Sequence, residues 1–314
     1  PPRPPPPPPP PPLFFFKQKS AYDLGVRLVG SEMCIRDRLG FDGIFVNDHV
    51  IVPADLTSRY PYRSNGVFPI SHTDNIFDPI VTLSYLAATT RTIKLGFSVL
   101  ILPYRQPILN AKMLSTLDVL SNGRLIVGAG VGWMEEEFNL LEANYVGRAN
   151  ETDHHIAQLK DLWGCDPIDI PDIGTVSMHP KPTSRPRPPI WTGGITKKAL
   201  RRAAMYADGW HGIRLTPSEL ESLSNDLLAL REKHHNNTDS FVVSMRSVFE
   251  ITDSQQSINR IPLRGSTEQI QQDIQTYHRS GLQYLMIEPR GNSLKELQTQ
   301  ISRFMNEIIE KLDL

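Results

Sequence analysis

The sequence predicts an α/β fold, a (β/α)8 or TIM barrel that lacks or replaces its first strand. Short apolar runs bounded by turn residues alternate with amphipathic helical stretches, and seven such units follow one another from residue 39. No glycine-rich phosphate turn follows the first run, as an open, doubly wound dinucleotide-binding sheet would require. The chain of 314 residues is long enough for one barrel, which takes about 250 residues.

The first expected strand, residues 43–47 (GIFVN), is a short apolar run of the kind that is buried on both faces of a parallel sheet. Six further runs are expected to be strands: residues 93–102, 124–128, 189–192, 209–213, 241–251 and 284–288. Asp78-Pro79 is typical of a helix start, because an N-cap is followed by proline. Apolar residues recur at helical spacing in residues 109–120, 267–280 and 294–312.

Residues 1–38 have a different composition, and we expect them to be a non-native, disordered segment that leaves residues 39–314 as the domain. Eleven of the 27 prolines lie among the first twelve residues, and residues 17–38 show neither a strand period nor a helix period. Residues 14–19 and 29–38 (VGSEMCIRDR) resemble translated sequencing-adapter readthrough. A segment of this origin would have overwritten the natural first strand.

Charge and composition exclude several classes of protein. Lys and Arg number 33 against 34 Asp and Glu, so there is no basic excess for bulk binding to nucleic acid. No run approaches the roughly 18 apolar residues of a membrane helix, so no membrane partner is expected. Cys34 and Cys165 provide neither a disulfide framework nor metal-site spacing, and a reduced cytoplasm is the expected location.

In a barrel the active site lies at the carboxyl ends of the strands, so the residues after each strand are the candidates. Asp48-His49 follow the first expected strand and open a long connection to residue 75. A carboxylate beside an imidazole indicates an acid/base or cofactor-orienting pair, and the alternative is a loop cap beside a surface histidine. Ser98 interrupts an apolar strand, which indicates close approach of a ligand or a bulge, or else ordinary irregularity.

Two glycine-containing turns are further candidates. Gly130-Val131-Gly132 follow an expected strand and let the backbone approach a flat ring or a phosphate, although a plain turn has the same pattern. Gly193-Gly194 open a helix with Lys197 and Lys198 in its first turn, which favours phosphate binding at the helix N-terminus over a simple tight turn. Glu135-Glu136-Glu137 begin another expected helix, where carboxylates oppose the helix dipole.

Taken in order, these segments resemble the bacterial luciferase-like monooxygenase family, and more narrowly its deazaflavin-dependent oxidoreductase branch. The resemblance covers residues 39–312. Its most specific pieces are LGFDGIFVNDHV (39–50), LPYRQP (102–107), SNGRLIVGAGVGWMEEEF (121–138), PPIWTGGITKKALRRAAMYADGWHG (188–212) and STEQIQQDIQTYHRSGLQYLMIEP (266–289).

The resemblance implies a barrel that binds coenzyme F420, a deazaflavin, or alternatively FMN. Asp48 and His49 would face the ring as catalytic residues and assist hydride transfer, and Ser98-Val99 matches a family bulge with a non-prolyl cis peptide. Trp133 stands where some deazaflavin dehydrogenases have glutamate, so no carboxylate donor is expected there. No metal is implied. The implied cofactor-binding residues are Ser98, Val99, Gly130, Val131, Gly132, Thr192, Gly193, Gly194 and Ile195.

The leading hypothesis is an oxidoreductase that moves a hydride between a reduced deazaflavin and a small organic substrate. The alternative within the same fold is an FMN-dependent monooxygenase that uses oxygen. Two hypotheses rank lower: a metal-dependent hydrolase using Asp48, His49, His72 and His211, and an inactive, truncated chain with exposed strand edges. The family is commonly dimeric, so a homodimer is compatible with the resemblance, and the sequence leaves the substrate open.

Overall fold

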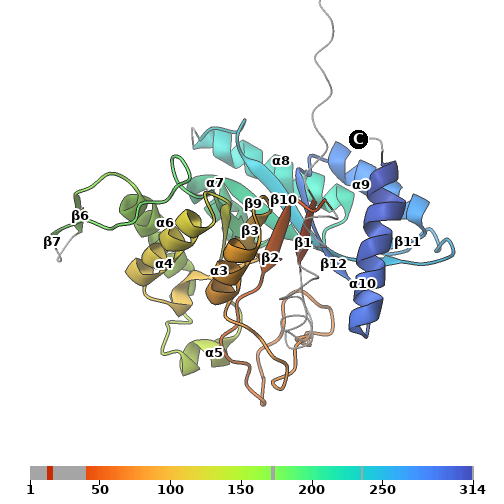
Figure 1. Cartoon of the computed structure of the whole chain (residues 1–314), viewed down its shortest axis with the longest axis horizontal. Coiled ribbons are helices and arrows are strands. Elements are labelled where there is room, and N and C mark those ends of the chain that lie inside the picture. Colours follow the sequence, from red (N-terminus) through yellow and green to blue (C-terminus); the bar gives the residue numbers. More distant parts are fainter. Residues whose placement is uncertain (1–12, 17–39, 171–173, 235, 313–314) are drawn as a thin grey trace, which may run out of the picture.

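Eight parallel strands form the centre of the molecule, with helices packed outside them (Figure 1). The computed structural model describes residues 13–16, 40–170, 174–234 and 236–312. The strands pair in the order β12-β1-β2-β3-β5-β8-β9, and β10 pairs with both β9 and β12, so the pairings run around a ring. Their bounds are β1 Leu13–Phe16, β2 Gly43–Val46, β3 Lys94–Phe97, β5 Leu125–Gly130, β8 Ile190–Gly193, β9 Gly209–Ile213, β10 Val242–Ile251 and β12 Tyr284–Pro289.

The predicted α/β barrel is therefore confirmed, and its first strand is replaced instead of missing. β1 lies between β12 and β2, with Phe15 opposite both Ile287 and Ile44 in register. The four residues of β1 belong to the segment that we expected to lie outside the domain. The rest of that segment lies outside the described residues, so its non-native origin and its disorder stay predictions.

The strand expected over residues 93–102 divides at a cis peptide between Ser98 and Val99. β3 ends before this bond, β4 (Leu100–Ile101) pairs with β5 after it, and the 3-10 turn Leu102–Tyr104 follows. The residues alone left a bulge, close approach of a ligand and ordinary irregularity open at this position, and the structure shows an interrupted strand with the cis bond that the family resemblance implied.

Helices connect successive strands, and most begin where the sequence places a capping residue. Asp78 accepts a hydrogen bond from Val81 N at 2.8 Å, and Thr216 and Ser266 each begin a helix with a complete capping box. The last predicted helix is interrupted, because Phe304–Ile308 is π-helical and Ile309–Lys311 is 3-10. The α-helices are α3 Pro79–Thr89, α4 Pro107–Leu120, α5 Glu135–Leu140, α6 Arg148–Trp163, α7 Lys197–Tyr206, α8 Pro217–Lys233, α9 Thr267–Arg279 and α10 Leu294–Arg303.

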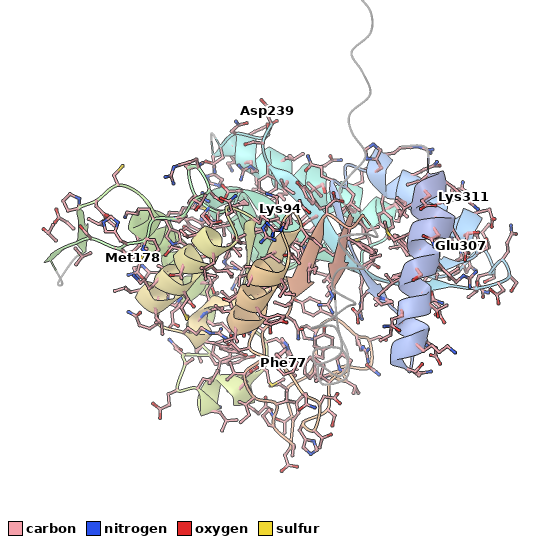
Figure 2. All side chains as sticks on the ribbon, in the orientation of Figure 1. Phe77, Lys94, Met178, Asp239, Glu307 and Lys311 are labelled. Carbon is pink, nitrogen blue, oxygen red and sulfur yellow. The ribbon has the colours of Figure 1, made fainter. Side chains whose placement is uncertain are left out.

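Smaller elements complete the described chain. β6 (Ile168–Ile170) and β7 (Gly174–Val176) form an antiparallel hairpin away from the barrel, and β11 (Arg264–Gly265) pairs with the end of β10 (Figure 1). In Figure 2, Asp239, just before β10, and Phe77, at the end of the connection after β2, lie at opposite ends of the barrel. Among the described residues, no helix combines the length and the apolar character needed to cross a membrane.

The barrel interior is filled with large side chains. Phe45 of β2 and Trp191 of β8 stack with their ring centroids 6.0 Å apart, and Ile126 and Met286 pack against them. Since β2 and β8 are not neighbours in the ring, this contact crosses the interior. A Cβ atom at Gly96 of β3 would collide with the Phe45 ring, which explains the glycine there. The centre is thus a packed core, and the space for chemistry lies at the strand ends.

Arg124, buried at the start of β5, ties the end of α3 to the barrel. Its guanidinium donates to the carbonyl oxygens of Ala87, Thr90 and Ile93 at 2.9 to 3.0 Å. Arg124→Met is expected to lower the free energy of unfolding by about 3 kcal/mol, because buried carbonyl groups lose their donors. Urea unfolding checks this. The same change at exposed Arg91 is the control, and equal losses in the two variants would refute the role given to Arg124.

Candidate active site

The strand ends that the sequence singled out meet at one place. β2, β3, β5 and β8 are consecutive in the ring, so their carboxyl ends are neighbours. The Val99 side chain fills the space between Gly130 and Gly193: a Cβ at Gly130 would collide with it, and a Cβ at Gly193 would lie 3.2 Å from its Cγ1. Gly132 follows β5 with a φ of 76°, and a Cβ there would lie 2.5 Å from the Phe138 ring. Val131, beside it, is half-buried.

His49 is held by a carboxylate from α5. Its Nδ1 lies 2.7 Å from Glu137 Oε2, and the same oxygen accepts from the Tyr104 hydroxyl at 2.8 Å. Glu137 Oε1 accepts from the backbone N–H groups of Val50 and Ile51. A carboxylate with four donors stays ionised and can only accept, so His49 donates from Nδ1, and Nε2 is the other ring nitrogen, which Glu137 does not bind.

The electrostatics agree with this assignment. Burial raises the pKa of the Glu137 carboxyl, but the hydrogen bonds from His49, Val50 and Tyr104 outweigh burial, and the pKa lies below its ordinary value. The neighbouring Glu136 has a lowered pKa as well, because hydrogen bonds from Thr57 and Ser58 outweigh its desolvation. The two carboxylates therefore fasten the long connection after β2 to α5.

Asp48 has a different environment from His49. Both of its oxygens accept from the Arg105 guanidinium, at 2.7 and 2.9 Å, and one also accepts from Ile101 N at 2.9 Å. Burial raises the pKa of Asp48, and Arg105 and the Ile101 N–H act against this rise. The side chain is 2% exposed. Asp48 thus links the end of β2 to β4, and both of its oxygens are engaged in these contacts.

Ser98 takes part in a buried chain of hydrogen bonds. Ser244 donates its hydroxyl to Trp210 O at 2.9 Å, so it accepts from His211 Nδ1 at 3.0 Å. His211 Nε2 is then the acceptor of the Ser98 hydroxyl at 2.8 Å. Burial, and next the charge of Arg246, lower the pKa of His211 to about 3, so the ring is neutral at ordinary pH. The Ser98 oxygen is left free to accept from a bound molecule.

An aromatic cluster covers His49. Tyr60 and Phe68, from the long connection, and Trp133, which follows β5, have ring centroids 5.1 to 5.3 Å apart. The Phe68 ring lies 4.9 Å from His49, and the Trp133 ring lies 6.3 Å from it. Met134, fully buried, packs beneath them. The imidazole therefore lies in largely apolar surroundings.

The turn after β8 lies at the start of α7, as the sequence predicted. Gly194 has a φ of 111°, and its carbonyl accepts from Trp210 Nε1 at 2.7 Å. Ile195, Lys197 and Lys198 are exposed, and the first turn of α7 contains no acidic residue. Within the described residues, the buried Thr192 hydroxyl has no hydrogen-bond partner. This combination fits a phosphate group or another small anion.

The described residues contain no group of three or more His, Cys, Asp or Glu side chains that could hold a metal ion. Asp48, His49 and His211, which the hydrolase hypothesis grouped as ligands, are engaged with Arg105, Glu137 and the two serines instead. The hydrolase hypothesis therefore has no support from the geometry.

A family model described as luciferase-like monooxygenase matches residues 35–291. The chain belongs to the luciferase-like monooxygenase family. An uncharacterised protein of Mycobacterium tuberculosis is 31% identical over 198 residues, which are 62% of this chain and 68% of that protein. An FMNH2-dependent dimethylsulfone monooxygenase of Pseudomonas putida is 29% identical over 145 residues, 44% of this chain and 39% of the enzyme.

Solved structures share the fold of this family member. An F420-dependent secondary alcohol dehydrogenase, in complex with an F420-acetone adduct, superposes with a TM-score of 0.74 over 97% of this chain and all of that one, at 15% identity. At this identity the likeness establishes the barrel alone. Members of the family are oxidoreductases or monooxygenases, and the family assignment therefore supports an enzyme that acts on a small molecule.

Sequence reasoning missed the residues that orient His49. Glu137 looked like a carboxylate opposing a helix dipole, yet it is fully buried and binds a histidine 88 residues away. Tyr104 and His211 also gave no local signal of these contacts, since the partner of Tyr104 comes from α5 and the partners of His211 come from β10 and from the residue after β3. A carboxylate at the apolar, buried position next to Phe138 was the one available hint.

Proposed function

We propose that this protein is an oxidoreductase that moves a hydride between a reduced deazaflavin, coenzyme F420, and a small organic substrate. The observation that carries the proposal is the buried His49–Glu137–Tyr104 array beside the Ser98–Val99 bulge. An imidazole whose Nδ1–H is held by Glu137 takes a proton at Nε2, and the imidazolium so formed gives it back, which is the task that accompanies hydride transfer at a hydroxyl or carbonyl carbon.

The residues that would hold the cofactor follow from the same geometry. Ser98, Val99 and the glycines of β5 and β8 would contact the ring, and the residues from Thr192 to Ile195 would bind the phosphate. The cofactor supplies the hydride chemistry, and the protein supplies orientation and electrostatics. Asp48 is a positioning residue in this proposal, because its carboxylate is committed to Arg105 and Ile101.

The aromatic cluster of Tyr60, Phe68 and Trp133 would exclude water around His49 Nε2. Exclusion of water strengthens each electrostatic interaction and keeps the proton exchange specific. Glu137 would stabilise the protonated imidazole, since its carboxylate lies 2.7 Å from Nδ1.

A second candidate is an FMN-dependent, oxygen-using monooxygenase, favoured by the similarity to the dimethylsulfone monooxygenase. Oxygen uptake coupled to reduced FMN distinguishes the two candidates, because a deazaflavin is a poor activator of oxygen. Hydride exchange with F420 and no oxygen uptake supports the first candidate.

Fluorescence quenching of coenzyme F420 and of FMN by the purified protein tests the proposal directly. We expect binding of at least one, and binding of neither would reject both candidates.

Ile195→Asp places a negative charge at the exposed turn after β8. It is expected to weaken the binding of FMN about tenfold while changing the binding of riboflavin, which has no phosphate, little. Ile258→Asp, at a position 97% exposed, is the control. If the variant weakened the binding of FMN and of riboflavin equally, this result would contradict phosphate binding at this turn.

A further inference from the structure

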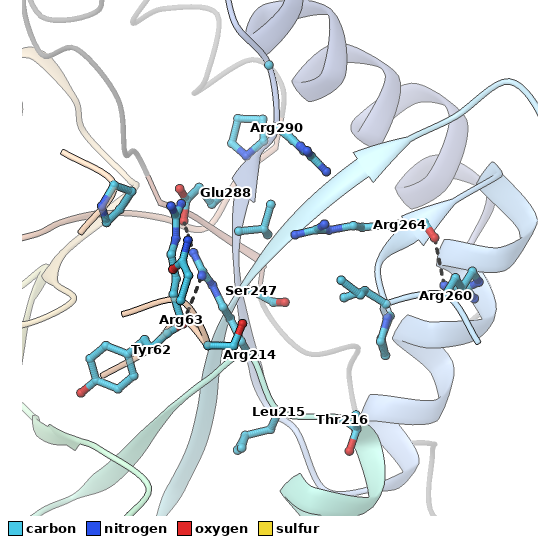
Figure 3. Close-up of a pocket in the computed structure, with 18 of the residues that line it drawn as sticks. Tyr62, Arg63, Arg214, Leu215, Thr216, Ser247, Arg260, Arg264, Glu288 and Arg290 are labelled. Carbon is cyan, nitrogen blue, oxygen red and sulfur yellow. Dashed lines mark hydrogen bonds and ion pairs between the residues drawn. The ribbon is translucent and has the colours of Figure 1, made fainter. Parts of the chain in front are cut away.

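A cavity of about 850 Å³, drawn in Figure 3, lies where β9 and β12 end. His49 follows β2, a parallel strand of the same ring, so the cavity and His49 are at the same end of the barrel. The connection after β2 forms one wall through Tyr62 and Arg63, and the other walls come from the ends of β9, β10 and β12 and from β11. None of the residues from 192 to 198, where we propose that the cofactor phosphate binds, lines this cavity. Its volume is in the range that holds a small organic molecule.

The cavity wall carries a large excess of positive charge. Among the described residues that line it, Glu288 is the single carboxylate. In Figure 3, Arg63 and Arg214 lie beside Glu288, and Arg264 extends toward the strands from the opposite side. The lining arginines are Arg63, Arg214, Arg260, Arg264 and Arg290.

Neighbouring carboxylates neutralise only part of this charge. Arg260 pairs with Asp273 at 2.6 Å, and Arg290 pairs with Glu250 at 2.9 Å. Glu288 pairs with Arg246, behind the lining, at 3.0 Å, and lies 3.9 Å from Arg214. Within the described part of the chain, Arg63 and Arg264 have no carboxylate within ion-pair distance.

Two buried donors in this wall lack an acceptor. The Nε atoms of Arg214 and Arg264 are inaccessible to solvent and have no hydrogen-bond partner among the described residues. Burial lowers the pKa of both guanidinium groups, and neighbouring arginines lower it further. These Nε atoms do not face the cavity, and what suits its wall to an oxyanion is the guanidinium charge of Arg63 and Arg264, which no carboxylate of the described residues neutralises.

The cavity adjoins the aromatic cluster that covers His49. The charge of Arg246 acts on His211, which binds Ser98, and also on Tyr62 in the cavity wall. The Tyr62 ring packs on Tyr60 at 5.4 Å, and Tyr60 packs on Trp133. A molecule anchored in the cavity would therefore reach toward the aromatic cluster that covers His49.

We propose that this cavity, through Arg63, Arg214 and Arg264, binds the anionic group of the substrate, a carboxylate or a phosphate. The assignment of this anionic group to a substrate rests on the function proposed above, whereas the anion site itself follows from the arginines of the cavity. The cofactor is the other source of the same chemistry, since FMN and coenzyme F420 carry phosphate. The test must therefore separate an anion on the substrate from one on the cofactor.

The test uses isothermal titration of the full chain with inorganic phosphate and with citrate at about 0.15 M salt, with and without bound FMN or coenzyme F420. We expect saturable binding of at least one anion that is unchanged by the cofactor. Arg214→Met and Arg264→Met should each weaken binding at least about tenfold. Arg279→Met, which removes the same charge from an exposed position at the end of α9, should leave binding unchanged.

Three results would overturn the proposal: no anion binding at this salt concentration, equal weakening in all three variants, or displacement of the anion by the cofactor. The last result would assign the cavity to the cofactor's own phosphate. Anion binding in a protein that binds neither FMN nor coenzyme F420 would keep the anion site and refute the proposed function. Circular dichroism of each variant verifies that a loss of binding is not a loss of fold.

Discussion

His49→Asn is expected to lower kcat by about 10²- to 10⁴-fold, with little change in cofactor affinity. Asparagine still donates to Glu137 but has no counterpart of Nε2, so the variant loses proton exchange and keeps the packing. The measurement is the single-turnover rate of hydride transfer, together with the dissociation constant of the cofactor. A variant with the wild-type rate would exclude His49 as the acid/base.

Tyr104→Phe is the matched control for this result. It removes one of the four donors to Glu137 and leaves the imidazole in place, so we expect a loss in rate of less than about tenfold. Glu137→Gln should act through the imidazole by disturbing its tautomer. It should therefore shift the pH profile of the rate, which a purely structural change would not do.

The second large effect is on the pH dependence of stability. The pKa of His211 is about 3 in the folded protein, well below its ordinary value of about 6.5. Below pH 6.5 the unfolded chain binds a proton that the folded chain does not. This contribution to stability is therefore complete above pH 6.5 and is lost as the pH falls toward 3, by about 2 kcal/mol at pH 5 and about 5 kcal/mol in all.

Urea unfolding at pH 7 and pH 5 measures this effect. His211→Gln cannot bind the proton, so its loss of stability between the two pH values should be smaller than that of the wild type by about 2 kcal/mol. His154→Gln, at an exposed position, should keep the wild-type difference. Equal differences in all three proteins would contradict a neutral, buried His211.

Much of the fold could be predicted because its signals are local. Apolar runs and helical periods located the strands and most helices, and Asp78, Thr216 and Ser266 begin helices through contacts made within four residues. The first strand could not be predicted this way. Backbone hydrogen bonds of a parallel ladder require an extended segment and no particular side chain, so Leu13–Phe16 takes the open position between β12 and β2.

The sequence by itself determined the parallel barrel, the order of its elements and the strand ends where the candidate residues lie. It also indicated Asp48-His49, the bulge at Ser98 and the turn at Gly193-Gly194, because each is encoded by adjacent residues. Only the tertiary structure decided which groups face each other. Glu137 binds His49 across 88 residues, and His211 binds Ser98 across 113.

The arginine cavity, like these contacts, is decided by the tertiary structure alone. Its arginines come from the long connection after β2, from the residues that follow β9 and β12, and from β11 and the segment before it, and the overall charge of −1 conceals them. Charge is a local property in a folded protein, because burial and distance set the strength of each interaction. Closure of the barrel therefore creates both the oriented imidazole and the cationic wall, and neither exists as a pattern along the chain.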